Sequence, residues 1–120
     1  MVLVSQTRYN RASQFTYLHL NSKLKKKFRA IGHSLNPVVT VAGNGLTDSV
    51  LGELNRALDD HELIKVRIVG ARKERDSVTN QISKIEATEI IQKIGGVLLV
   101  YRPTRKPTLA LSNILRSNLL

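Results

Sequence analysis

The stretch "VTVAGNGLTDSVLGEL" places two glycines and an asparagine, Gly43-Asn44-Gly45, between an apolar β-branched run and a strongly helical segment. A tight turn from a strand into a helix leaves the first amide N–H groups of the helix without partners. Together with the positive end of the helix dipole, these groups bind anions. Glycine accepts a positive φ and lets a phosphate approach the backbone. The stretch therefore predicts either a simple turn or a phosphate-binding loop.

Three kinds of phosphate loop can be compared with these residues. A P-loop requires a Lys-Ser or Lys-Thr pair after its glycines, and none follows here. Gly43, Gly45 and Gly52 give the spacing G-x-G-x(6)-G, which differs from the dinucleotide-binding fingerprint. A loop that clamps a nucleic-acid backbone needs only a short glycine turn beside a helix N-terminus, for which Thr47 is a suitable cap. The last possibility fits the sequence.

The charge of the chain points to a polyanionic partner. Nineteen Lys and Arg residues against nine Asp and Glu give a net charge of +10 over 120 residues. The positive side chains repel one another unless a polyanion neutralises them, and nucleic acid is the commonest such polyanion. An anionic membrane surface is the second candidate, although no uninterrupted apolar stretch approaches the roughly 18–20 residues of a membrane span.

The basic residues expected to contact the polyanion fall into four segments. They come from the lysine-rich run at 23–29, the strand at 63–69, the charged stretch at 71–76 and the end of the last strand. Five aromatic residues in the whole chain are few for stacking on successive bases. We therefore expect contacts mainly to phosphates, which depend on shape rather than sequence. With the loop residues Gly43, Asn44, Gly45 and Thr47, the expected contacts are Lys25, Lys26, Lys27, Arg29, Lys65, Arg67, Arg72, Lys73, Arg102 and Arg105.

Catalytic and metal chemistry has little support in the sequence. There is no cysteine, and His19, His33 and His61 show no metal-ligand spacing. The cluster Asp59-Asp60-His61-Glu62 lies where a helix is expected to meet a strand, and a polar connection is ordinary there. We expect no enzyme activity, no cofactor and no metal. The absence of cysteine and of a secretory signal favours a cytoplasmic protein.

The apolar spacing predicts seven elements in the order helix, strand, helix, strand, helix, strand, strand. Leu24, Phe28 and Ile31 mark a first helix capped by Ser22 and ended by Gly32, and "ARKERD" (71–76) is expected to be a loop. Gly95-Gly96 predicts a hairpin between strands at 88–94 and 97–102. This order predicts a single compact α/β domain whose four-stranded mixed sheet is covered by helices. We expect a mobile N-terminal extension at 1–21, the domain at 22–103 and a basic C-terminal tail at 104–120, with Pro103 and Pro107 ending the ordered part.

The string "LNPVVTVAGNGLTDSVLGELNRALDDHELIKVRI", together with "LLVYRP", resembles the YhbY-like RNA-binding family, also called the CRM domain for chloroplast RNA splicing and ribosome maturation. The resemblance covers about residues 23–103. It implies a fold similar to the C-terminal domain of a bacterial translation initiation factor. It also implies RNA binding, with stand-alone bacterial members linked to precursors of the large (50S) ribosomal subunit.

The glycine loop of that family is usually written G-x-x-G, and this chain departs from it. The window contains Ala42-Gly43-Asn44-Gly45, so alanine stands at the first glycine position and only Gly45 carries over directly. If the first position requires a left-handed backbone, Ala42 would force the loop to shift.

The expected function is therefore RNA binding, with ribosomal RNA or pre-ribosomal large-subunit particles as partner. We expect a monomer with no membrane and no small-molecule substrate. Two alternatives stay open at this point. One is a small enzyme that binds a nucleotide phosphate in the loop, and the other is a protein that binds anionic membrane surfaces.

Overall fold

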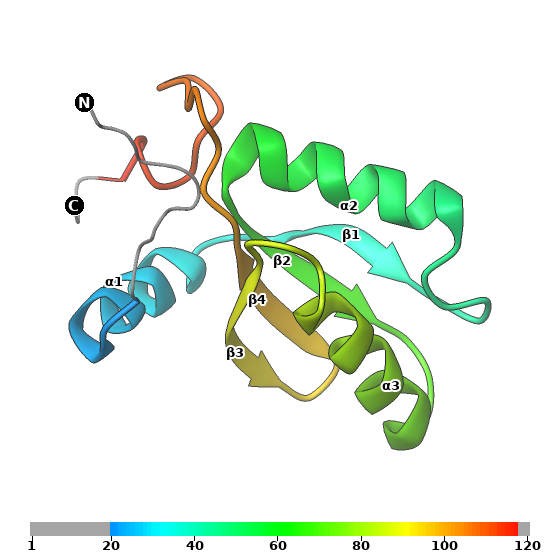
Figure 1. The fold of residues 1–120 in the computed structure, drawn as a ribbon. Coiled ribbons are helices and arrows are strands. Elements are labelled where there is room, and N and C mark those ends of the chain that lie inside the picture. The colour runs from blue at the N-terminus through cyan, green and yellow to red at the C-terminus, as the bar shows by residue number, and fades with distance from the viewer. Residues whose placement is uncertain (1–19, 118–120) are drawn as a thin grey trace.

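A computed structural model describes residues 20–117 of the chain (Figure 1). Most of the expected N-terminal extension, residues 1–19, and the last three residues of the expected tail lie outside the described part. The seven elements follow in the predicted order, which confirms the α/β architecture. They are α1 (Ser22–Gly32), β1 (Pro37–Val41), α2 (Asp48–His61), β2 (Leu63–Ile68), α3 (Arg72–Ser83), β3 (Glu89–Ile94) and β4 (Val97–Tyr101).

The four strands form one mixed sheet in the order β1-β2-β4-β3. β1 and β2 are parallel, whereas β2 pairs with β4 and β4 pairs with β3 in antiparallel fashion. Because the parallel strands end at the same edge of the sheet, the connection from β1 to α2 lies beside the connection from β2 to α3. A hydrogen bond from Val69 N to Val41 O, 2.8 Å long, joins the two strand ends. This edge positions the candidate site.

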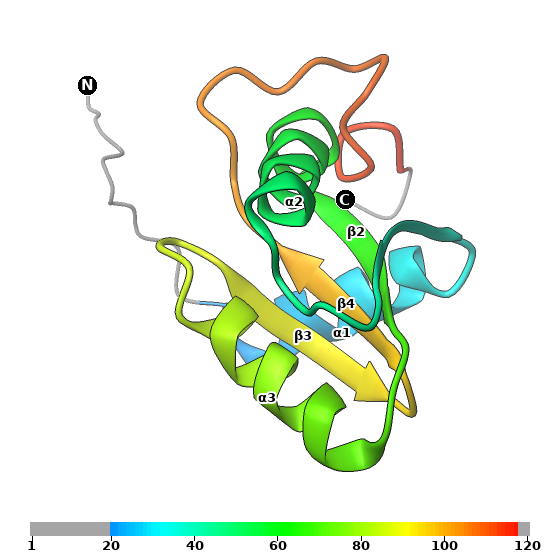
Figure 2. The same cartoon turned by 90° about the vertical axis from the view of Figure 1, so that its right-hand side faces the viewer.

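Helices α2 and α3 cover one face of the sheet, and α1 covers part of the other (Figure 2). The burial of alternate residues along each strand fixes this division. On the first face, the fully buried Leu54, Leu58 and Ile82 pack against strand residues that include Val66 and Val100. Val78 and Ile82 are the only apolar residues of α3, so the strands supply most of the core on that side.

On the opposite face, α1 lies directly on the sheet. Phe28 packs against Tyr101, with ring centroids 4.6 Å apart, and Ile31 is buried beside Leu63. A methyl group on Gly32 would lie only 2.6 Å from Leu99 Cδ2, so glycine lets α1 approach the sheet without displacing the Leu99 side chain. The sequence predicted that Gly32 follows the last residue of the helix. Instead it is the last helical residue, and the C-cap, His33, has an ordinary φ of −56°.

Two expected boundaries are wrong. Asn21, not Ser22, caps α1, because its Oδ1 accepts a hydrogen bond from Leu24 N–H at 2.8 Å. The stretch 71–76 is not a loop, since α3 begins at Arg72. Its start has no serine, threonine or aspartate cap. The Glu74 carboxylate instead reaches back to accept the Ala71 N–H at 2.7 Å, which is half of a capping box.

The chain also stays ordered beyond Pro103 and Pro107, contrary to expectation. We call residues 102–117 the C-terminal segment; it lies against the C-terminal end of α2 (Figure 1). The Glu62 carboxylate holds it by accepting bonds from Ser112 Oγ at 2.6 Å and from Thr104 N–H at 3.0 Å. Within residues 20–117, no helix combines the length and apolar character that crossing a membrane demands.

Candidate nucleic-acid interface

The glycine loop, residues 42–46, is a tight turn open to the surroundings. Gly45 N–H donates to Ala42 O at 2.7 Å, and Thr47 N–H donates to Gly45 O at 3.0 Å. Gly45 has a φ of +69°, which disfavours any side chain, whereas Gly43 has no positive φ. A Cβ at either position would meet no atom within 4 Å. The backbone of the loop is therefore accessible to a large anion on its outer side.

Alanine at position 42 does not disturb this turn. Ala42 is exposed and has no positive φ, so its methyl group causes no backbone strain. The left-handed residue of the turn is Gly45, which is the glycine that carries over from the family pattern. Ala42 therefore removes no conformation that the loop uses.

The N-terminus of α2 offers hydrogen-bond donors next to the loop. Thr47 caps the helix as predicted, since its Oγ1 accepts Val50 N–H at 3.2 Å. The N–H groups of Asp48 and Ser49 precede the first intrahelical donor and stay directed outward. They can bind a phosphate, helped by the helix dipole. The Asp48 carboxylate in the same turn opposes that attraction, because it repels a second anion at this helix end.

The predicted cations lie on both faces of the sheet. Lys65 and Arg67 share the α1 face with Leu63, where Arg67 is exposed and pairs in register with Thr40 and Val97. Leu63 is buried under α1, whereas Arg67 is exposed, so the end of β2 near the glycine loop stays open on this face. The α1 cations on the same side are Lys25, Lys26, Lys27 and Arg29.

The other predicted cations differ in their freedom to bind. Arg72 and Lys73 lie exposed in the first turn of α3, on the opposite face, and Arg105 is exposed in the C-terminal segment. Arg102 is engaged within the protein. Its guanidinium donates to Asn55 Oδ1 at 2.9 Å and pairs with Asp59 at 2.9 Å, and its side chain is only 14% exposed. Contact with RNA would require Arg102 to give up these bonds.

The acidic cluster 59–62 anchors the C-terminal segment. Asp59 pairs with Arg102, His61 Nδ1 lies 2.7 Å from Leu111 O, and Glu62 is bonded to Ser112. Glu62 is buried with a φ of +64°, a conformation that few non-glycine residues adopt. Burial and the nearby Glu62 charge raise the pKa of the Tyr101 phenol well above its usual value. These side chains therefore serve the packing of residues 102–117.

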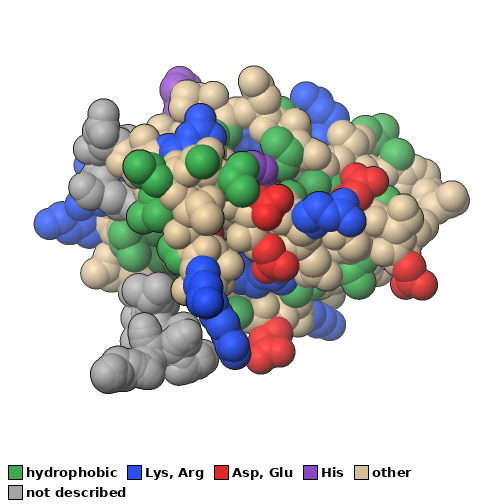
Figure 3. All heavy atoms as spheres, turned by 90° about the horizontal axis from the view of Figure 1, so that it is seen from above, with side chains coloured by type: hydrophobic (Ala, Val, Ile, Leu, Met, Phe, Trp, Pro, Cys, Tyr) green, Lys and Arg blue, Asp and Glu red, His purple; other side chains and the backbone are tan. Residues whose placement is uncertain are grey.

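Figure 3 views the molecule from the side of α2 and the C-terminal segment. On this face Asp and Glu side chains lie among Lys and Arg side chains, with hydrophobic side chains grouped to one side. The exposed large apolar residues of the C-terminal segment are Leu109, Leu111 and Leu115. This face lacks the uniform positive charge that a nucleic-acid surface needs.

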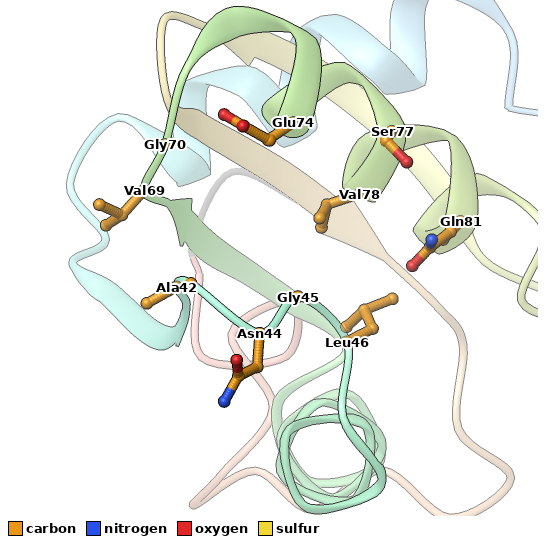
Figure 4. A pocket seen from close by; sticks show the side chains of 11 residues that line it. Ala42, Asn44, Gly45, Leu46, Val69, Gly70, Glu74, Ser77, Val78 and Gln81 are labelled. Carbon is orange, nitrogen blue, oxygen red and sulfur yellow. The ribbon is translucent and has the colours of Figure 1, made fainter.

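A cavity of about 510 Å³ opens between the glycine loop and α3. Gly43, Asn44 and Gly45 border it on one side, and the side chains of Glu74, Val78 and Gln81 on the other (Figure 4). A loop at residues 71–76, as the sequence predicted, would leave no such cavity. Once α3 begins at Arg72, the positions 74, 77, 78 and 81 follow the spacing of one helix face, and that spacing is the signal that could have found the cavity.

Comparison with known proteins agrees with this architecture. The CRS1/YhbY (CRM) domain model matches residues 20–102, most of the chain. The chain belongs to the CRM family. A Pseudomonas aeruginosa protein named as a probable RNA-binding protein is 48% identical over 98 residues, which cover 81% of this chain and 94% of the relative.

Two further relatives extend the comparison of this CRM domain. A Haemophilus influenzae protein named as an RNA-binding protein is 41% identical over 93 residues, covering 77% of this chain and 94% of that protein. The solution structure of a hypothetical protein from Staphylococcus aureus superposes with a TM-score of 0.63 at 22% identity, over 73% of this chain and 93% of the other. At that identity the similarity concerns the fold.

Among residues 20–117, no three acidic, histidine or cysteine residues form a group that could hold a metal.

Proposed function

We propose that this CRM-domain protein binds structured ribosomal RNA without catalysing a reaction, and that it acts on precursors of the large ribosomal subunit. The open glycine loop at the N-terminus of α2, in a chain of net charge +10, is the observation that carries the proposal. The names of the P. aeruginosa and H. influenzae relatives support RNA as the polyanion. The link of stand-alone bacterial family members to large-subunit precursors supports the ribosomal assignment.

In this proposal the RNA backbone crosses the sheet edge where β1 and β2 end. One phosphate accepts hydrogen bonds from the loop and from the first N–H groups of α2. Neighbouring phosphates lie along Lys65, Arg67 and the α1 cations, with Arg72 and Lys73 on the other side of the edge. Such contacts hold or shield an RNA surface, and they depend on its shape. The protein acts as a cytoplasmic monomer and needs no cofactor.

Salt dependence of binding tests the RNA proposal directly. Each neutralised phosphate releases counterions, so the logarithm of the association constant should fall linearly with the logarithm of salt concentration. We expect a slope steeper than roughly −3 for a structured fragment of large-subunit ribosomal RNA, corresponding to three or four contacts. A flat dependence contradicts the proposal, and equal or tighter binding to anionic vesicles at the same salt favours a membrane surface instead.

The ribosomal assignment needs a separate experiment. We expect the tagged protein to sediment with large-subunit precursors in a ribosomal gradient and to crosslink to their RNA. Crosslinks to small-subunit precursors would show that the partner is the small-subunit particle and not the large one. Magnesium-dependent binding and turnover of a nucleoside triphosphate would instead identify a nucleotide-using enzyme.

A further inference from the structure

The cavity beside the glycine loop has a mixed lining. Val78 and Leu46 face the space between the loop and α3, whereas the Glu74 carboxylate lies toward Gly70 and the Gln81 amide toward the other end (Figure 4). Its volume of about 510 Å³ falls within the range of ligand sites, about 300–1,000 Å³. It adjoins the loop that we propose to hold a phosphate, so a nucleotide bound there would have its base within reach of the cavity.

The charge of the cavity wall excludes a second phosphate as occupant. Glu74 is exposed at the cavity and carries the only acidic side chain among its lining residues. A carboxylate repels a phosphate but accepts hydrogen bonds from the amino groups of bases. The apolar side chains of Val78 and Leu46 offer a surface for the face of a flat, uncharged ring. Charge and polarity therefore both favour a base over a phosphate.

Hydrogen-bonding capacity remains on the α3 side of the cavity. One Glu74 oxygen, Oε1, accepts the Ala71 N–H at 2.7 Å. In the part of the chain that the structure describes, the other oxygen has no partner, and neither does the side chain of Ser77 or Gln81. These groups can accept from and donate to the edge of a base without breaking a bond that holds the fold.

We propose that the cavity receives one unpaired RNA base, and that Glu74 selects a base with an exocyclic amino group such as cytosine. This inference rests on the proposed RNA binding and adds to it a base-selective contact. Phosphate contacts at the loop set the position of the strand, and the base turns toward α3. Val78 and Leu46 pack against the ring, and Glu74 Oε2 accepts a hydrogen bond from the amino group.

Oligocytidine and oligouridine of eight residues test the proposal, because their bases differ on the edge that Glu74 would contact. We expect the full chain to bind oligocytidine roughly five- to tenfold more tightly at equal salt, the low end of what one base contact gives. In E74Q the ratio should fall to within about twofold of one, because an amide both donates and accepts. Glutamine keeps the capping role at the start of α3.

The matched control is E53Q, which removes the same charge from an exposed position of α2 outside the cavity. It should keep the preference for oligocytidine. Any general effect of removing a negative charge acts equally on two RNAs of the same length and leaves the ratio of their affinities unchanged. A lower ratio in E74Q but not in E53Q therefore cannot come from charge alone. As a second variant, S77L places a larger side chain at the exposed cavity wall and should reduce the oligocytidine preference similarly.

Each outcome decides the matter. Equal affinity of the unaltered chain for the two oligomers overturns the inference, as does an unchanged preference in E74Q. If neither oligomer binds but structured ribosomal RNA does, the base site is wrong and the proposed function stands. If no RNA binds with the expected salt dependence, both fail.

Discussion

Helices α1 and α2 pack on opposite faces of one sheet, yet their outer surfaces carry opposite charge. α1 has five cations and no acid, whereas α2 has four acids and one arginine. Both bury an apolar stripe, through Phe28 and Ile31 in one case and Leu54 and Leu58 in the other. Packing accounts for the buried stripes but does not require either outer charge. The difference supports the proposal that the α1 side meets the polyanion.

In the proposed complex the two helices have different roles. There α1 supplies a field of positive charge that would attract RNA without regard to its sequence. α2 supplies only its N-terminal end, where the glycine loop and the N–H groups of Asp48 and Ser49 can hold one phosphate. The rest of α2 and the C-terminal segment on its far end should lie away from the RNA.

Neutralising α1 should have the largest effect. We expect the triple variant K25Q/K26Q/K27Q to bind structured ribosomal RNA about a hundredfold more weakly near 0.1 M salt, with a salt slope shallower by about two to three, because each phosphate contact contributes close to one unit of slope. Filter binding across a salt series measures both quantities. The control R56Q/K84Q/R116Q has the same net charge and changes exposed cations outside the proposed surface. Equal losses of RNA affinity in the two variants would mean that binding depends on net charge alone and that α1 has no special role.

Altering the glycine loop should have an intermediate effect. G45A places a methyl group at a φ of +69°, at a cost of roughly 1–2 kcal/mol, so the turn should shift and RNA binding should fall about five- to tenfold. G43A adds the same methyl group where φ is not positive and no atom lies within 4 Å, and it should bind normally. Circular dichroism and thermal unfolding should show both variants folded. If G45A binds as well as G43A, the loop is not part of the interface.

Removing the acid at the start of α2 should have the smallest effect and the opposite sign. D48N relieves repulsion at the proposed phosphate site, so RNA affinity should rise about two- to threefold, while the helix loses about 0.3–1 kcal/mol of favourable dipole interaction. D60N, near the other end of α2, is the matched control and should leave affinity unchanged. Binding and thermal unfolding measured on the same samples separate the two effects. A gain in D60N as large as that in D48N would argue against a phosphate at this helix end.

The sequence predicted the elements whose apolar spacing is regular. Leu54 and Leu58 in α2, the alternation through Val66 and Ile68 in β2, and the Gly95-Gly96 turn all correspond to observed elements. Thr47 was also correctly identified as a cap. In each case the determining interactions lie within a few residues of each other along the chain, where periodicity and cap chemistry can be recognised.

The features that the sequence did not predict have two physical causes. One is contact between residues far apart in the chain, and the other is a helix turn made of charged residues. The first turn of α3 contains no apolar residue before Val78, so its helical state depends on the Glu74 cap rather than on a periodic stripe. The C-terminal segment is held by Glu62 and Ser112, fifty positions apart, and no local pattern reveals that pair. The cavity beside the loop follows from the parallel pairing of β1 and β2, which brings α3 next to residues 42–46.

The seating of α1 on the sheet has a thermodynamic consequence. If α1 were detached from the sheet, binding to RNA would have to fix its position. The loss of backbone freedom would then make the binding free energy less favourable. Gly32 against Leu99 and Phe28 against Tyr101 fix the helix axis beforehand. That ordering is completed when the chain folds. Close packing of α1 on the sheet would thus preorganise the positive surface that we propose for RNA.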